Sequence, residues 1–346
     1  MRVSRPVFAI PVLLLALAMA TPAPASGLED GKDAFARGDY VTAFDLARPA
    51  AEHGNPEAQY LIGSMYAQGL GVLQDHAQAL RWFLEAARQG HVQAQYDLGV
   101  LFANGLGTPK DMDKAATWYM AAADQGHAEA QFAMGVMFHQ GNGMDQDFGQ
   151  AMHWFTKAAE QGLAKAMLNL GAMFAQGQGV ARDLAQAAGW YNRAAELGNV
   201  DAQYNLGLLY AGGEGVERDY DQAVYWYTLA ARNGHADAQY NLAYLYNEGQ
   251  GVAQDYAKSA QWFERAANQG HARAQSNLGI LYLNGKGVAQ DYVRAHMWFN
   301  LSASRLPPGE DRQRVVQARD EVAALMTPEQ IAEAQKLARE WEPHTS

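Results

Sequence analysis

The sequence predicts an all-α protein, a right-handed α-solenoid of antiparallel helix pairs that ends in capping helices. Three observations predict this class: a repeat of fixed length, the same helix signals in every repeat, and a proline–glycine breaker where the repeats stop. In such arrays the shared positions determine the fold and the deviating positions carry specificity. The repeat is 36 residues long and is marked by seven glycines, Gly54, Gly90, Gly126, Gly162, Gly198, Gly234 and Gly270.

Residues 199–234 show how one repeat predicts a helix pair. Asn199 is suited to cap a first helix that runs to about Ala211, with an apolar stripe made of Ala202, Leu206 and Tyr210. Asp219 is suited to cap a second helix that runs to about Asn233, with a facing stripe made of Ala223, Trp226, Ala230 and Ala231.

Glycines punctuate this pair. Gly213 and Gly215 predict the turn between the helices, and Gly234 predicts the end of the second helix. Gly207 lies inside the first helix, where glycine costs roughly 1 kcal/mol relative to alanine. We expect close approach of the second helix to compensate for this cost, because no Cβ separates the two backbones.

The same register holds through the array, which makes the prediction strong. A tryptophan followed by Phe or Tyr recurs in each repeat, at Trp82, Trp118, Trp154, Trp190, Trp226, Trp262 and Trp298. A capping aspartate precedes it, at Asp75, Asp111, Asp147, Asp183, Asp219, Asp255 and Asp291. The helical phase of the tryptophans matches that of the alanines, so we expect them to pack in the core.

Residues 1–25 have the pattern of a cleavable signal peptide. Arg2 and Arg5 precede an apolar run over residues 7–20, which is shorter than the ~20 residues that cross a bilayer. Small residues then predict a cut after Ala25, before Ser26, and an uncleaved anchor is the alternative. The chain has no cysteine, which excludes a lipoprotein. We therefore expect a periplasmic or secreted protein with no integral membrane span in its mature chain.

The charge of the chain argues against nucleic acid as a partner. Loss of the two arginines lowers the formal net charge from −11 to −13, and no basic stripe offsets it. Because there are no disulfides, stability must come from helix packing.

The repeat consensus identifies a family resemblance. The pattern A-x-A-Q-Y-x-L-G-x-x-Y-x-x-G-x-G-V, an aspartate, then A-x-x-W-[FY]-x-x-A-A-x-x-G closely resembles the Sel-1-like repeat, a relative of the tetratricopeptide repeat. The resemblance covers residues 55 to about 305. The chain departs from the consensus at Met167, Leu168, Ala243 and Leu306.

These signals divide the chain into four parts. Residues 1–25 are the signal peptide, 27–54 a degenerate leading repeat, and 307–346 two capping helices at about 311–326 and 328–341. Thr327 and Gln330 predict a capping box at the start of the last helix. Seven repeats fill the middle, at 55–90, 91–126, 127–162, 163–198, 199–234, 235–270 and 271–306.

No motif in the sequence supports catalysis or cofactor binding. The aspartates fit helix caps, and the glycine-rich turns lack the strand and the Lys-Ser/Thr pair of a phosphate loop. Recurrent histidines suggest a metal, but equivalent atoms in successive repeats lie about 10 Å apart, too far to share one ion. We therefore predict no metal and no cofactor, and a helix-start role for His91, His127, His235 and His271.

The candidate binding residues lie on the first helix of each repeat, which lines the concave face in tetratricopeptide-like folds. An asparagine amide both donates and accepts, so a row of them suits an extended peptide backbone. The alternative is that these amides fill interhelical positions. The candidates are Asn169, Asn205, Asn241 and Asn277, Asp97 in the same register, and Tyr96, Tyr204 and Tyr240 one residue earlier. One turn further, Val100, Val136, Leu208, Tyr244 and Ile280 vary in size and are suited to give selectivity.

We expect a non-enzymatic scaffold or adaptor of the bacterial cell envelope that binds a protein or peptide. Two alternatives stay open. Cysteine-rich members of the resembled family have been linked to β-lactam binding or hydrolysis, although this chain lacks their cysteines. A structural spacer is the other.

Overall fold

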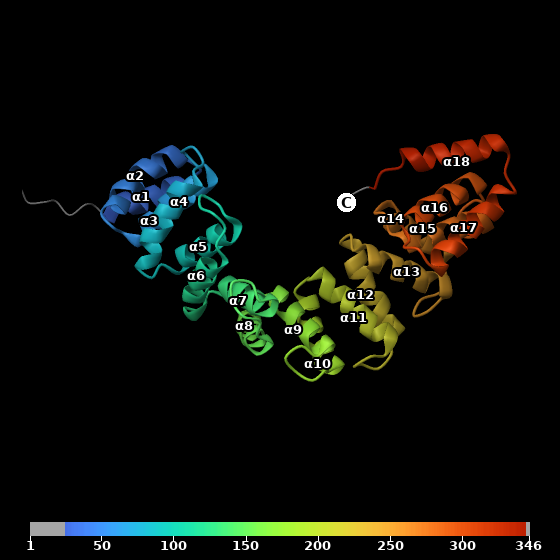
Figure 1. Cartoon of the computed structure of the whole chain (residues 1–346), viewed down its shortest axis with the longest axis horizontal. Coiled ribbons are helices and arrows are strands. Elements are labelled where there is room, and N and C mark those ends of the chain that lie inside the picture. The colour runs from blue at the N-terminus through green and yellow to red at the C-terminus, as the bar shows by residue number, and fades with distance from the viewer. Residues whose placement is uncertain (1–24, 344–346) are drawn as a thin grey trace, which may run out of the picture. The chain divides into compact units, whose positions relative to one another are not determined.

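The computed structural model describes residues 25–343, and every regular element in that range is an α-helix. The eighteen helices confirm the predicted all-α class, and Figure 1 shows them as successive pairs. The predicted signal peptide lies outside the described residues, apart from its last residue, Ala25. The chain divides into two compact units at His127.

The first unit contains three helix pairs. In each pair the two helices pack on one another, and within the unit α2 also contacts α3 and α4 also contacts α5. Its helices are α1 (Ala25–Ala36), α2 (Tyr40–Glu52), α3 (Pro56–Gln68), α4 (His76–Arg88), α5 (Val92–Asn104) and α6 (Met112–Asp124).

The second unit repeats this arrangement five times and then adds two helices. The helices are α7 (Ala128–Gln140), α8 (Phe148–Glu160), α9 (Ala164–Gln176), α10 (Leu184–Glu196), α11 (Val200–Gly212), α12 (Tyr220–Arg232), α13 (Ala236–Glu248), α14 (Tyr256–Asn268), α15 (Ala272–Asn284), α16 (Tyr292–Arg305), α17 (Glu310–Ala323) and α18 (Pro328–Glu340).

The predicted helix ends are confirmed. The Asp219 carboxylate accepts a hydrogen bond from the backbone N–H of Gln222 at 3.0 Å, and each of the other six predicted aspartates caps its helix in the same way. Gly213 has φ of 70° and Gly234 has φ of 88°, left-handed values that glycine adopts without strain.

A glycine–ring contact closes the helix pair, as the position of Gly207 predicts. A Cβ added to Gly207 would lie 2.6 Å from the ring of Tyr227, so the ring of α12 rests directly on the backbone of α11. The contacting ring is the residue after the tryptophan. In α13 the glycine is replaced by Ala243, which is fully buried.

The tryptophans occupy a shallower layer than predicted. Trp154, Trp226 and Trp298 are buried, which confirms the core role, but the other four are half-buried. The reason is that the following aromatic residue fills the interior. A cation three residues later covers several outer faces, for example Arg193 at 4.4 Å from the centroid of Trp190.

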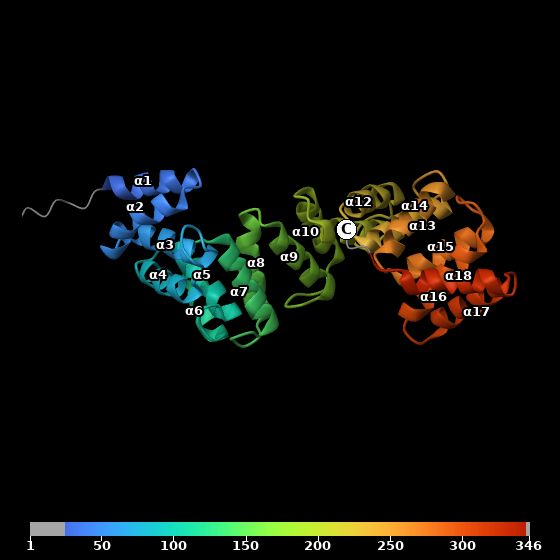
Figure 2. The same ribbon diagram turned by 90° about the horizontal axis from the view of Figure 1, so that it is seen from above.

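The last two helices cover the end of the array. Both α17 and α18 pack against α16, as Figure 2 also shows. The predicted capping box of α18 is confirmed: the Thr327 hydroxyl accepts from Gln330 N–H, and the Gln330 side chain accepts from Thr327 N–H. Trp341 then meets Trp298 edge to face, with ring centroids 6.3 Å apart.

Two alanine substitutions in α11 test the glycine–ring contact. We expect Gly207→Ala to lower the free energy of unfolding by about 1–3 kcal/mol, since its methyl group would overlap the Tyr227 ring. Gly212→Ala is the control: its methyl would meet nothing closer than 3.4 Å, so helix propensity should raise stability by up to about 1 kcal/mol. Denaturant unfolding measures both, and equal effects of the two substitutions would contradict the contact.

Candidate functional site

The predicted binding residues lie on the odd-numbered helices and are all half-buried. Three of them stack on the histidine at the start of the next odd-numbered helix, and three interact with a tyrosine of the preceding one. We call the resulting side-chain contacts between successive odd-numbered helices the ladder. Its members are a tyrosine and an acidic or amide residue on one helix, and a histidine and an Asn or Asp on the next.

The ladder is most complete between α13 and α15. The ring of Tyr240 stacks on His271 with centroids 4.7 Å apart. His271 Nδ1 accepts from Ala274 N–H at 3.0 Å, and its Nε2 lies 3.1 Å from Asp237 Oδ1. The Asn277 side chain is close enough to Tyr240 to hydrogen-bond its hydroxyl and oppose the rise in its pKa that burial causes.

The same contacts recur in both units. Tyr204 stacks on His235 at 4.3 Å, and the Asn241 amide lowers the burial-raised pKa values of Tyr204 and Tyr227 by hydrogen bonding. In the first unit, Tyr60 stacks on His91 at 4.6 Å and interacts with Asp97.

Asp97 differs from the asparagines in its charge. Burial raises the pKa of its carboxyl, while hydrogen bonds from Gln93 and Tyr60 act in the opposite direction. The next tyrosine, Tyr96, stacks on His127 at 4.6 Å. The predicted helix-start role is confirmed for His91, His235 and His271, whose Nδ1 atoms accept from the first turn of the helix.

The contacts of the asparagine row differ from helix to helix. Asn241 and Asn277 occupy interhelical positions, as the alternative hypothesis expected. Asn169 donates to the carbonyl of Lys165 in its own helix at 2.8 Å. Whether the row also binds a ligand stays a prediction.

The ladder is broken between α9 and α11. Leu168 stands where α3, α5, α7, α11 and α13 carry an aromatic residue, and Asn199 stands where three helices have a capping histidine. Asn205 therefore has neither a stacking pair nor a tyrosine hydroxyl from α9 beside it. Among residues 25–343 its side-chain amide makes no hydrogen bond.

A cavity of about 570 Å³ opens beside this break. Residues of α9, α10, α11 and the following turn line it: Ala175, Tyr191, Asn205, Leu208, Leu209, Ala211, Gly212 and Glu214. Burial raises the pKa of the Tyr191 hydroxyl to about 12, so this group is protonated and able to donate at neutral pH. The sequence analysis identified Asn205 and Leu208 but missed Tyr191 and Glu214. The departure from the repeat consensus at Leu168 was the signal that pointed to this junction.

An exposed apolar row continues from this cavity. Leu208, Tyr244 and Ile280 lie 36 residues apart on α11, α13 and α15, with 41%, 45% and 45% of their surfaces exposed. Because the ladder joins α11 to α13 and α13 to α15, the three side chains belong to one face of the second unit.

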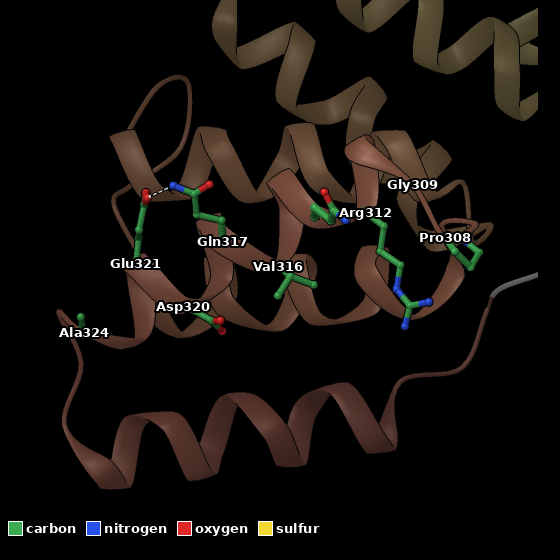
Figure 3. Close-up of a pocket in the computed structure, with 9 residues that line it drawn as sticks. Pro308, Gly309, Arg312, Val316, Gln317, Asp320, Glu321 and Ala324 are labelled. Atoms are coloured by element: carbon green, nitrogen blue, oxygen red, sulfur yellow. Dashed lines mark hydrogen bonds between the residues drawn. The ribbon is translucent and has the colours of Figure 1, made fainter.

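A larger cavity lies elsewhere, along α17. It measures about 730 Å³, and one stripe of α17 with Pro308 and Gly309 lines it. Figure 3 shows that Gln317 and Glu321 on this stripe are hydrogen-bonded to each other, at 2.8 Å. A surface made by a single helix offers no opposing wall to a ligand.

Residues 25–343 contain no cluster of three or more potential metal-ligating His, Asp or Glu side chains. In the same range, no helix combines the length and the apolar character needed to span a bilayer.

The comparisons identify the family. The Sel1 repeat model matches residues 25–55, 56–91, 92–127, 128–163, 164–199, 200–235, 236–271 and 272–305, so the chain belongs to the Sel1 repeat family. This tetratricopeptide-like solenoid is typical of protein–protein interaction scaffolds, and the family is generally non-catalytic.

Two solved structures illustrate the likeness. A Sel1 repeat protein from Oxalobacter formigenes is 36% identical, with 70% of this chain and 97% of that chain covered and a TM-score of 0.62. The protective antigen c5321 of uropathogenic Escherichia coli, which has an SLR fold, is 28% identical, with 91% of both chains covered and a TM-score of 0.57. No curated protein matches the chain.

Two asparagine substitutions separate ladder members from the unpaired amide. We expect Asn241→Ala to lower the free energy of unfolding by about 1 kcal/mol, because it removes an amide that serves two tyrosine hydroxyls. Asn205→Ala should leave stability within about 0.5 kcal/mol of the original chain, since no internal bond is lost. Denaturant unfolding is the measurement, and a larger loss for Asn205→Ala would refute the broken ladder.

The ladder also predicts a pH dependence at His271. Burial lowers the pKa of this imidazole, while Asp237 raises it and Arg273 adds to the lowering. A lowered native pKa means that the unfolded chain binds more protons, so the stability from His271 is present above about pH 6.5 and is lost as the pH falls below it. His271→Asn should keep the cap, as Asn199 does in α11, and reduce the loss of stability between pH 7 and 5. Urea titrations across this range measure the free energy of unfolding at each pH. The same dependence of stability on pH in His271→Asn and in the original chain would contradict the prediction.

Proposed function

We propose that this protein is a non-catalytic adaptor that binds an extended segment of a partner protein across the odd-numbered helices of its second unit. The observation that carries the proposal is the exposed apolar row on α11, α13 and α15. Scattered exposed apolar residues are common, but three at one register on joined helices form a continuous contact surface.

The flanking groups suit a peptide. Half-buried amides at Asn205, Asn241 and Asn277 lie one turn before the apolar row. A peptide in extended conformation presents backbone N–H and C=O groups beside alternating side chains, so amides and apolar contacts are both needed to hold it. The rigid helical scaffold limits the entropy lost on binding.

The location belongs to the same proposal. We propose that the chain acts in the bacterial cell envelope or outside the cell, after removal of residues 1–25. The support is the pattern of residues 1–25, in which two arginines precede a short apolar run and small residues precede Ser26. Fractionation of the producing cell tests this location.

A double substitution on the apolar row tests the binding function. We expect Tyr244→Ala with Ile280→Ala to reduce partner recovery from envelope extracts at least tenfold while stability changes little, because both side chains are exposed. Tyr225→Ala is the matched control, an exposed tyrosine on α12, a helix outside this face.

Quantitative affinity purification with the three forms gives the readout. Recovery of the same proteins by the double variant and the original chain would contradict the proposal, as would recovery of nothing above background.

A further inference from the structure

The break in the ladder sets one repeat apart, and this inference rests on the proposed function, which it makes more specific. Several substitutions fall at the α9–α11 junction together. Besides Leu168 and Asn199, Met167 replaces the buried glutamine of other repeats, and Leu197 replaces the glutamine that bonds to it elsewhere. Gln269 and Gln239 form such a pair at 2.8 Å. The N-cap residue of α9 is Leu163, which makes no side-chain capping hydrogen bond.

These substitutions leave polar groups at the junction without internal partners. Tyr227, the residue equivalent to Tyr191, interacts with Asn241 of the following helix, whereas no such interaction joins Tyr191 to Asn205. Both groups line the 570 Å³ cavity beside α11. A hydroxyl and an amide that elsewhere serve the ladder are therefore available to a ligand here.

The cavity combines an apolar wall with one acid at its rim. Ala175, Leu208 and Leu209 supply apolar surface, and the exposed Glu214 supplies a carboxylate. Glu214 forms no ion pair within residues 25–343. The nearby guanidinium of Arg218 donates to the carbonyl of Gly212 at 3.1 Å, and Lys165 is paired with Glu129.

We propose that this cavity seats an arginine or lysine side chain of the bound peptide. The aliphatic stem lies against Leu208 and Ala175, the cationic head pairs with Glu214, and Asn205 bonds the peptide backbone. Long basic side chains bury their stems while the head stays polar, which matches an apolar cavity with an acidic rim. Arginine binds more tightly than lysine, because its planar guanidinium pairs with a carboxylate through two parallel hydrogen bonds.

The charge of the whole protein favours the same partner. The formal net charge is −11, so a basic segment is attracted and an acidic segment is repelled before contact is made. The unpaired acid at the cavity then fixes the position of the basic residue along the peptide.

Short peptides test this proposal directly. Fluorescence anisotropy measures binding of nine-residue peptides that carry arginine, lysine, norleucine or glutamate at the central position to the exported form of the full chain. Norleucine keeps the stem of lysine and removes its charge. We expect the arginine peptide to bind at least about tenfold more tightly than the norleucine peptide, the range for a charge-assisted hydrogen bond.

Variants at the rim locate the effect. Glu214→Gln should abolish the preference for arginine, whereas Glu217→Gln, an exposed acid in the same turn that does not line the cavity, should keep it. Leu168→Tyr should restore the ladder to Asn205 and weaken the arginine peptide, with a melting temperature equal to or above that of the original chain. If Leu168→Tyr stays folded and binds the arginine peptide more weakly, the loss of binding comes from the changed junction and not from unfolding.

The outcomes distinguish this inference from the proposed function. Equal affinity for the arginine and norleucine peptides, or equal effects of Glu214→Gln and Glu217→Gln, would overturn the basic-residue site and leave binding on the apolar row intact. Free arginine amide that binds as tightly as the peptide would also overturn it, because the site would then hold a small cation. Absence of any peptide or protein binding would overturn both.

Discussion

The structure depends on the direct contact between a helical glycine and an aromatic ring inside six of the eight helix pairs that precede α17. At Gly207 the absence of a Cβ allows the Tyr227 ring to rest on the α11 backbone. The ring then fills the interior, and the preceding tryptophan is displaced toward the surface of the second helix. The odd-numbered helices consequently present one face to their neighbours in the array and one to the solvent. Everything proposed about binding concerns that second face.

Contacts between repeats use the side chains that looked most suited to a ligand. A histidine caps its own helix through Nδ1, and its Nε2 contacts an acid of the preceding helix. Its ring stacks on a tyrosine of that helix. Each contact is modest alone, and their value lies in satisfying several half-buried polar groups at once. Where Leu168 interrupts this pattern, the same polar groups are left for another molecule. Specificity in a repeat protein thus arises at the position where the repeat is least regular.

The sequence was sufficient to predict the helix pairs, the aspartate and histidine caps and the capping box at Thr327, because these depend on residues within a few positions of one another. It also predicted the close approach at Gly207. It left open whether Asn241 and Asn277 fill interhelical positions, since that depends on the rotation of one repeat against the next. Nor did it identify Glu214 and Tyr191 as neighbours of Asn205, because only the packing of α10, α11 and the following turn brings these residues to one cavity.

The central claim is that the ladder joins α11, α13 and α15 of the second unit and is missing on both sides of α9, where Leu163 and Leu168 replace its members. Native-state hydrogen exchange, followed helix by helix by mass spectrometry, tests it most directly, because amide protection reports the local free energy of opening. The account predicts that the amides of α9 exchange faster than those of α13, its counterpart with a complete ladder. Equal protection of the two helices, or faster exchange in α13, would contradict it.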